Sequence, residues 1–560
     1  MCVCVIFSLY CAVEAVLNDE SDADPAAMQE VLQTWMASRN IAVREKIRLR
    51  GRQAFAAEKM PQTAVEHIEE VIVYIPQAEE RVRRRGGARR MNGHRQNGGR
   101  GGGGGDAMDE DANARGGDGG DGTVPMMMET VRNTGSGMKE SLEGEHEEII
   151  PAGSARRIDV HVYRLSSEPP TDEYFDDDDD AGGGGDASSV EVTREWILPS
   201  RMLHGRWDAL IYDDNVKRNL LEYASTALFF SQRGVDASLV SWNRVVLLHG
   251  PPGTGKTSLC QALANTLAAR LGHVYANGAQ LVEVNAHSLF SRWFSESGKL
   301  VAKLFARIHE MVEDETTLTF VLLDEVESLT AARGAAVAGA EPSDAVRVVN
   351  ALLTQIDALR SRPNVMILTT TNITNAVDTA FIDRADIKAY IGLPSEHARY
   401  DILRSCVDEL CASGVIHSMH AGSMHDYSDV VTYASTASLS NGTALSATWR
   451  MSCMLREVAA VCDGGSGRFL RKLPFLAHAS CATSLANTQS LDFEQLARAM
   501  WRTARKEAAM RSFLATRGAP SSSSDVAALR ACAHLSSPGL YDDDDYLDDD
   551  EDDDIFGPPF

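Results

Sequence analysis

The chain carries a glycine-rich loop and, further along, a pair of acids. Residues 250–257 read Gly-Pro-Pro-Gly-Thr-Gly-Lys-Thr, and an apolar run at 320–323 is followed directly by Asp324 and Glu325. In a loop of this kind the glycines allow successive backbone N–H groups to turn toward phosphates, the lysine reaches the β and γ oxygens, and the threonine hydroxyl coordinates Mg²⁺ at the N-terminus of a helix. The pattern predicts a site for ATP and Mg²⁺. Its binding residues are Gly250, Pro251, Pro252, Gly253, Thr254, Gly255, Lys256, Thr257 and Asp324.

The two acids are expected to have different tasks. Asp324, together with Thr257, would hold the Mg²⁺ ion, and Glu325 would polarise the attacking water in phosphoryl transfer. Each motif has a plainer interpretation on its own, because a glycine-rich turn can be only a turn and Asp-Glu after a strand can be only a helix cap. Their order and their context favour a site that hydrolyses ATP.

The surrounding elements must bring these motifs to one edge of a sheet. Strands that are almost wholly apolar are typical of parallel sheets covered on both faces, and such sheets bind ligands at the carboxyl ends of their strands. Strands alternate here with helices, which predicts an α/β fold with a doubly wound parallel sheet. We expect strands at 245–248, 282–285, 320–323 and 365–369, and helices at 215–230, 300–312 and 346–359.

The pattern changes on both sides of this module. After Pro394 it is predominantly helical, at 396–411 and 469–511, with a Ser/Gly/Thr-rich loop expected at 435–446. Upstream, residues 28–36 have helical spacing, 64–75 are ambiguous, and 157–163 alternate as a strand. The chain is therefore expected to hold a small helical lid domain after the large domain and a smaller α+β domain before it.

The length of 560 residues allows roughly three or four domains. Glycine-rich and acidic stretches divide the chain further. The expected organisation is an unassigned terminus at 1–26, a substrate- or adaptor-recognition domain at 27–199 with disordered insertions at 86–122 and 172–186, a large ATPase domain at 200–394, a lid at 395–515 and a disordered acidic tail at 516–560.

Charge and cysteine usage exclude several classes of protein. Two acidic runs, at 172–180 and 542–554, account for 18 of the net charge of −26, so the remainder is only mildly acidic and indicates no nucleic-acid-binding surface. Arg-Gly-Gly repeats within 83–117 resemble RNA-binding tails, but they lack interleaved aromatic residues and also suit a flexible insertion. The ten cysteines show no zinc or disulfide spacing, which indicates a reducing compartment.

The apolar stretch at 1–13 lacks the basic start of a signal peptide and is too short to span a bilayer. These features favour a buried or mis-started terminus over a targeting segment. No other stretch suggests a membrane segment.

Three further positions resemble motifs of the AAA+ ATPases, in the serial order of that family. Asn372, after the fourth strand, is similar to sensor 1, and Arg384 in the segment 378–388 resembles an arginine finger that reaches a neighbouring subunit's ATP. Arg468, at the start of a lid helix, resembles sensor 2. The resemblance implies catalytic parts for Glu325, Asn372, Arg384 and Arg468. Ile387 stands where many members carry a second arginine, so only one finger is expected.

Other segments resemble one family within this class. Residues 196–200, 204–212, 288–298, 341–344 and 468–478 are similar to the pachytene checkpoint ATPases, the thyroid-receptor-interactor AAA+ proteins of animals. The resemblance implies a homo-hexameric ring that remodels HORMA-domain proteins, through an adaptor or without one, in meiotic chromosome axes, the recombination checkpoint and the spindle checkpoint. It implies residence on chromosomes in the nucleus and in the cytoplasm. A severing or disaggregating ATPase of the related meiotic clade is the alternative.

Trp293 and Phe294 form an aromatic pair between polar neighbours, and exposed aromatic pairs often mark a contact surface. In rings of the family, the corresponding loop faces the central channel, which implies that these two residues grip substrate. The alternative is a buried contact with the next helix, because large aromatic side chains are highly buried on average.

Overall fold

A computed structural model describes the chain over residues 9–19, 21–37, 41–42, 46–50, 54–55, 58–74, 149–150, 156–175, 190–213, 215–236, 239–285, 297–327, 344–372, 379–417, 424–437, 446–481 and 491–517. The chain divides into two compact units. The first comprises Met1–Ala15, Ala26–Glu66 and Glu70–Val160, and the second comprises Val16–Pro25, His67–Glu69 and His161–Phe560. Each unit is described by itself.

The amino-terminal part is built on a four-stranded sheet with the order β3-β4-β1-β6. Its strands are β1 (Leu9–Leu17), β3 (Lys46–Arg50), β4 (Ile68–Tyr74) and β6 (Arg156–Arg164), and its helices are α1 (Pro25–Ala37) and α3 (Gln62–His67). Helix α1 buries Met28, Leu32, Trp35 and Met36, which recur on one face at the helical period. Strands β2 (Ile41–Ala42) and β5 (Ile149–Ile150) form a separate antiparallel pair.

Two expectations for this region need correction. The fold begins before residue 27, because residues 9–17, which include the end of the apolar stretch, form β1, whose Val13 and Ala15 are fully buried. The ambiguous stretch 64–75 is a helix and then a strand, since α3 ends at His67 and β4 starts at Ile68. The expected helix at 28–36 and strand at 157–163 are confirmed as α1 and β6.

The second unit contains a seven-stranded sheet with the order β13-β9-β12-β11-β10-β8-β7. Five neighbouring strands pair in parallel, which confirms the doubly wound α/β core, and all the strands and helices expected between 215 and 369 are present. The sheet's strands are β7 (Thr171–Phe175), β8 (Val190–Leu198), β9 (Val245–His249), β10 (Ala279–Asn285), β11 (Leu318–Asp324), β12 (Val365–Thr371) and β13 (Ile387–Tyr390).

The edge of this sheet corrects the expected domain boundary at residue 199. Strand β8 pairs antiparallel with β10, and β7 pairs antiparallel with β8, so both belong to the ATPase sheet. Residues 171–175 are a strand and not part of a disordered insertion, and Asp172 accepts a hydrogen bond of 2.7 Å from Nε of Arg194 across the pair. The insertion 86–122 lies outside the described residues.

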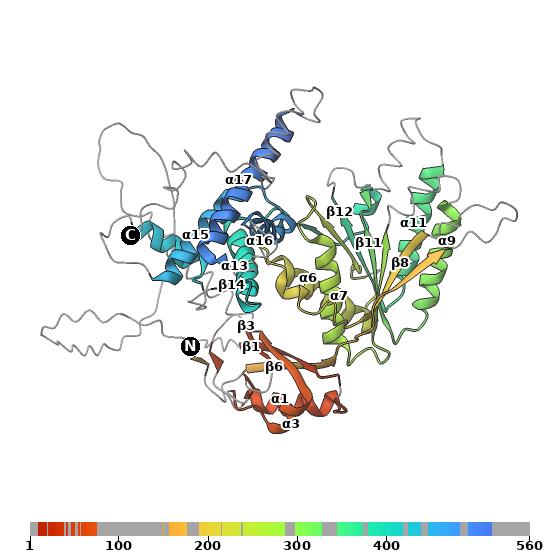
Figure 1. Cartoon of the computed structure of the whole chain (residues 1–560). Helices are drawn as coiled ribbons and strands as arrows, with labels where there is room; N and C mark the ends of the chain where they lie inside the picture. Colours follow the sequence, from red (N-terminus) through yellow and green to blue (C-terminus); the bar gives the residue numbers. More distant parts are fainter. Residues whose placement is uncertain are drawn as a thin grey trace, which may run out of the picture. The chain divides into compact units, whose positions relative to one another are not determined.

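Helices cover both faces of the sheet (Figure 1). Alternate residues of β9 point to opposite faces: Val245 and Leu247 pack in one cluster, Val246 and Leu248 in the other. The first cluster includes helices α9 (Ser297–Met311) and α11 (Asp344–Arg360), and the second includes α6 (Val216–Gln232) and α7 (Lys256–Leu271). The sheet is thus held between two apolar layers, with the carboxyl ends of its parallel strands at one edge.

A helical lid follows the large domain (Figure 1). Ser395 caps its first helix by accepting a hydrogen bond from the N–H of Ala398. The lid helices share one apolar core around Tyr400, Leu455 and Leu470. They are α13 (Glu396–Ala412), α14 (Tyr427–Ala437), α15 (Ala447–Val461), α16 (Gly467–Cys481) and α17 (Phe493–Arg517), with a short parallel pair, β14 (Ile416–His417) and β15 (Leu491–Asp492). The expected loop at 435–446 lies largely outside the described residues. Short helices α5 (Arg206–Ala209) and α12 (Thr379–Ile382) belong to the large domain.

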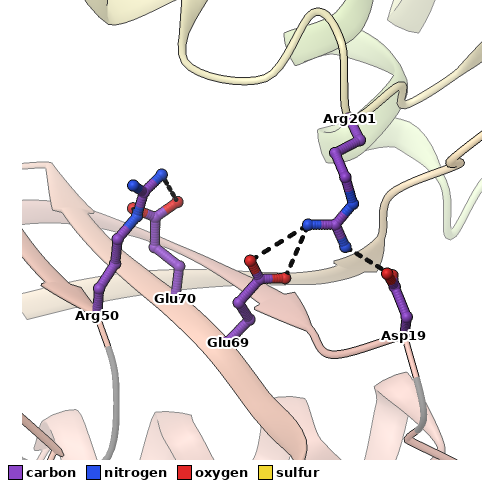
Figure 2. Close-up of polar contacts among 5 residues, drawn as sticks. All are labelled: Asp19, Arg50, Glu69, Glu70 and Arg201. Carbon is purple, nitrogen blue, oxygen red and sulfur yellow. Dashed lines mark hydrogen bonds and ion pairs between the residues drawn. The ribbon is translucent and has the colours of Figure 1, made fainter.

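Two groups of ion pairs involve the amino-terminal segments (Figure 2). In the first unit, Nε of Arg50 lies 2.6 Å from the carboxylate of Glu70, which is 2 % exposed. In the second unit, Arg201 lies between Asp19 and Glu69, at 2.6 Å and 3.1 Å. The hydrogen bond to Asp19 is the largest cause of the raised pKa of Arg201. One arginine thus ties two segments from near the start of the chain to the turn after β8.

Within the described ranges, no helix combines the length and the apolarity needed to cross a membrane.

Candidate functional site

The glycine-rich loop connects the end of β9 to the start of α7. Gly250, Gly253 and Gly255 have φ values of +144°, +77° and +91°, which favour glycine. A Cβ atom at Gly250 would lie 2.2 Å from the carbonyl oxygen of Ile391, so a side chain has no room there. Thr254 closes the turn by donating its hydroxyl hydrogen to the carbonyl of Pro251 at 3.0 Å. The loop has the backbone shape that allows N–H groups to converge on phosphate oxygens.

Lys256 is the first residue of α7 and is only 5 % exposed. Its Nζ donates to the carbonyl oxygens of Gly250 and Pro251, each at 2.9 Å. Burial lowers the pKa of Lys256, while Glu327, Asp324 and Glu325, in decreasing order, act to raise it. An ammonium group has three donors. Lys256 is therefore held in the loop by two of them, at the place where a phosphate oxygen can take the third.

The acid pair follows β11 at the carboxyl edge of the sheet. The hydroxyl of Thr257 donates to Oδ1 of Asp324 at 2.9 Å, and the hydroxyl of Thr370 donates to the same oxygen. A hydroxyl beside a carboxylate is a donor set that fits Mg²⁺, which prefers oxygen ligands. The structure thus brings the two predicted metal ligands together.

Glu325 is exposed at the same edge and has a φ of +58°, in the left-handed region that non-glycine residues rarely adopt. Its N–H donates to the hydroxyl of Thr370 at 3.2 Å, and the N–H of Val326 donates to the carbonyl of Thr370 at 3.0 Å. Both bonds anchor the turn to β12. An unusual backbone conformation held by two hydrogen bonds suits a side chain that must project toward a substrate.

Asn372 directly follows β12, as expected, and it contacts an acid that sequence reasoning missed. Its backbone N–H and its Nδ2 donate to Oε1 of Glu327, at 3.1 Å and 2.8 Å. Glu327 is visible in the sequence as an acid two residues after Glu325. Nothing in the sequence indicates its pairing with Asn372, because the contact joins residues at the ends of two different strands.

The side chain of Arg384 forms an ion pair with an acid of its own chain. Its Nε and Nη2 donate to the two carboxylate oxygens of Asp357 on α11, at 2.9 Å and 2.8 Å. The Arg384 side chain is 26 % exposed and that of Asp357 is 44 % exposed. A bidentate contact of this kind fixes the plane of the guanidinium group. Sequence reasoning did not foresee Asp357 as its partner.

Arg468 is a lid residue whose backbone contacts the glycine-rich loop. It lies in the first turn of α16, and its backbone N–H donates to the carbonyl of Gly253 at 3.0 Å. A Cβ atom at Gly253 would lie 2.9 Å from the hydroxyl oxygen of Ser466. The positive charge of Arg468 acts to lower the pKa of Lys256. The lid therefore lies directly against the phosphate-binding loop.

A pocket of about 240 Å³ opens beside this contact. Its lining includes Tyr212 and Val216 from the segment before β9, Thr254 from the loop, and Ile402 and Gly467 from the lid. The hydroxyl of Tyr212 lies 3.4 Å from the carbonyl oxygen of Gly255, and burial raises the pKa of this tyrosine. A pocket with aliphatic and polar side chains beside a phosphate loop fits a flat polar base such as adenine. These lining residues were not predicted as site residues.

Trp293 and Phe294 lie outside the described residues, so their expected part as pore residues stays a prediction.

The fold and the site together define an ATPase of the AAA+ class. Residues 246–393 match the family described as "ATPase family associated with various cellular activities (AAA)", and residues 395–508 match the "TRIP13-like, AAA+ ATPase lid C-terminal domain". The chain belongs to the pachytene checkpoint protein 2 family. It is 51 % identical over 348 residues to the pachytene checkpoint protein 2 homolog of Oryza sativa subsp. indica, a match that covers 62 % of this chain and 71 % of the relative.

Other relatives agree with this assignment. The human homolog is 48 % identical over 326 residues, which cover 58 % of this chain and 71 % of the relative. The structure of Caenorhabditis elegans PCH-2 aligns with a TM-score of 0.57 at 26 % identity, covering 90 % of this chain and all of that one. The expected family, the two-part AAA+ fold and the ATPase activity are confirmed.

Proposed function

We propose that this ATPase assembles as a homo-hexameric ring that uses ATP hydrolysis to unfold HORMA-domain proteins in part, either directly or through an adaptor. The settings we propose are meiotic chromosome-axis control, the recombination checkpoint and the spindle checkpoint, on chromosomes in the nucleus and in the cytoplasm. Membership in the pachytene checkpoint protein 2 family supports the proposal.

The observation that carries the proposal is the direct contact between the lid and the phosphate-binding loop. The N–H of Arg468 donates to the carbonyl of Gly253, and the lid residues Ile402 and Gly467 line the same pocket as Thr254 of the loop. A nucleotide bound there touches both domains. Hydrolysis of this nucleotide and release of its products therefore change the contacts between the lid and the loop. This change couples the chemical step to a movement of the lid.

The chemistry follows from the placement of the side chains. Lys256 and the loop N–H groups bind the β- and γ-phosphates, while Thr257 and Asp324 would hold Mg²⁺, which neutralises developing charge on the phosphate oxygens when bound. Glu325 accepts a proton from the attacking water as that water's oxygen bonds to the γ-phosphorus. The bond to the β–γ bridging oxygen breaks, and ADP leaves with inorganic phosphate.

Two further groups complete the proposed site. Asn372 lies at the end of β12, next to the strand that carries the acids, and orients the water. Arg384 acts on the ATP of a neighbouring subunit, where its positive charge stabilises the transition state. The resemblance of the segment 378–388 to an arginine-finger segment supports this proposal, and in its own chain Arg384 is held by the bidentate contact with Asp357.

Capture of a client by a hydrolysis-deficient variant tests the function. Glu325→Gln should bind ATP, stay assembled and retain a purified HORMA-domain protein that the wild type releases. A size-exclusion experiment with ATP, with and without an adaptor, measures this. Failure of Glu325→Gln to retain any HORMA-domain protein while it binds ATP would contradict the proposed client class.

The part proposed for Trp293 has a test of its own. If Trp293 grips substrate in the pore, Trp293→Ala should hydrolyse ATP within a few-fold of the wild-type rate and fail to convert a HORMA-domain protein. Were Trp293 a buried contact, truncation would cost roughly 3 to 5 kcal/mol of stability, and both activities would fall together. Melting temperature, ATPase rate and client conversion, measured on one preparation, separate the two.

A further inference from the structure

We propose that Glu327 is a positioning residue for ATP hydrolysis, which fixes the orientation of the Asn372 amide at the end of β12. Glu327 lies two residues beyond Glu325, in the turn that follows β11. The inference rests on the role proposed above for Asn372, which orients the attacking water. It requires neither a client nor an adaptor.

One oxygen of Glu327 receives two hydrogen bonds from one residue. Oε1 accepts from the backbone N–H of Asn372 at 3.1 Å and from its Nδ2 at 2.8 Å. The backbone bond holds the end of β12 against the turn after β11. The side-chain bond restricts the rotation of the Asn372 amide group. A contact that only held two strand ends together would not need this bond.

The charge of Glu327 selects one of the two amide orientations. An asparagine amide has two donors on its nitrogen and an acceptor on its oxygen, and a turn of 180° exchanges them. An ionised carboxylate only accepts, so the flipped amide would place oxygen against oxygen at this contact. Glu327 therefore keeps Nδ2 on its own side, and the carbonyl end of Asn372 is the end that can accept a hydrogen bond from water.

The charge of the same carboxylate also acts on the phosphate-binding lysine. Among the acids that act on Lys256, Glu327 exerts the largest electrostatic effect, ahead of Asp324 and Glu325. Glu327 therefore acts on both groups that must contact the γ-phosphate region, through hydrogen bonds on Asn372 and through its charge on Lys256. A carboxylate with a purely structural role in the turn would not need to interact with Lys256.

The substitution Glu327→Gln separates positioning from bracing. Glutamine keeps one oxygen that can accept both bonds from Asn372, but it lacks the charge that strengthens them. Its amide can also turn, at the cost of facing the backbone N–H of Asn372, and it then pairs with the flipped side chain. We expect kcat for ATP hydrolysis to fall about 10- to 100-fold, the size of effect that misplacement of a reacting group produces. The KM for ATP should stay within a few-fold, and the melting temperature should change little.

The matched control is Glu310→Gln on α9, which removes an equal charge from a side chain that is 68 % exposed. It should leave kcat unchanged. The second variant is Glu327→Gln combined with Asn372→Ala. If Glu327 acts through the amide of Asn372, the double variant should hydrolyse ATP no more slowly than Asn372→Ala alone.

Two results would overturn the inference. One is a wild-type kcat in Glu327→Gln while Asn372→Ala is slow, which would leave the proposed part of Asn372 intact. The other is a double variant whose loss of kcat is the product of the two single losses. A wild-type kcat in Asn372→Ala would instead refute the part proposed for Asn372, and the inference about Glu327 with it.

Discussion

Replacement of Gly253 by alanine should weaken nucleotide binding by a predictable amount. Gly253 has a φ of +77°, and an added Cβ would lie 2.9 Å from Oγ and 3.2 Å from Cβ of Ser466. A non-glycine residue in the left-handed region costs about 1–2 kcal/mol. We expect the variant loop to relax away from this strain in the absence of nucleotide, so the cost should appear as weaker binding of ATP. About 1–2 kcal/mol corresponds to a loss of affinity of roughly 5- to 30-fold, and the contact with Ser466 adds to it.

The contact with the lid can be removed separately. Ser466→Gly deletes the two nearest atoms that the new methyl group meets and leaves Cβ of Arg468 at 3.4 Å. Ser466 precedes α16 and accepts a hydrogen bond of 3.4 Å from the N–H of Phe469, and glycine at such an N-cap costs only a few tenths of a kcal/mol. The double variant should therefore recover the steric part of the loss and keep the part due to φ. Titration with a fluorescent ADP, with melting temperatures on the same samples, measures both.

Two other glycines serve as controls. Gly278 has a φ of +82° and would place a Cβ in open space, so Gly278→Ala should lower the melting temperature and leave ADP affinity unchanged. In Gly250→Ala the Cβ would meet a backbone oxygen at 2.2 Å, and Ser466→Gly should not restore binding. Wild-type affinity in Gly253→Ala, or no gain from Ser466→Gly, would refute the docking of the lid on the loop.

Three further outcomes are expected. Lys256→Ala should abolish ATP binding, whereas Glu325→Gln should bind ATP and stop turnover; equal ATP affinity in wild type and Lys256→Ala would contradict the site. Arg384→Ala should bind ATP normally and hydrolyse it roughly 10³-fold more slowly, measured as steady-state ATPase. Arg244→Met should lower stability by about 3 kcal/mol or more, because Arg244 is 5 % exposed and donates to backbone carbonyls that would lose their partner. Denaturant unfolding tests this, and an unchanged midpoint would contradict it.

The nucleotide site could be predicted from the sequence because its chemistry is local. The residues from Gly250 to Thr257 are contiguous, and the apolar run before Asp324 shows that a buried strand ends there. In a parallel sheet, strand ends meet at one edge, so two such motifs imply one site. The structure places Thr257 and Asp324 within hydrogen-bonding distance of each other.

The parts that escaped prediction depend on contacts between distant residues. Strand β8 joins the large sheet because its register matches β10, and nothing local in 190–198 shows that partner. The apolar stretch at 1–13 favours a buried terminus over a targeting segment, but a short apolar run does not by itself predict the strand β1 or the strands that pair with it. Likewise, the sequence does not show that Asp357 pairs with Arg384 or that Glu327 pairs with Asn372. Both contacts join residues that only the fold brings together.

The most direct test of an ATP site shared between neighbouring copies is a mixture of two inactive variants. Lys256→Ala subunits cannot bind ATP but carry an intact Arg384, and Arg384→Ala subunits bind ATP but lack the finger. In a freely exchanging 1:1 mixture, about a quarter of the interfaces in a ring would join an intact Lys256 to an intact Arg384. We predict that steady-state ATPase activity rises well above that of either variant alone. Activity that stays at the level of the separate variants would contradict the shared site.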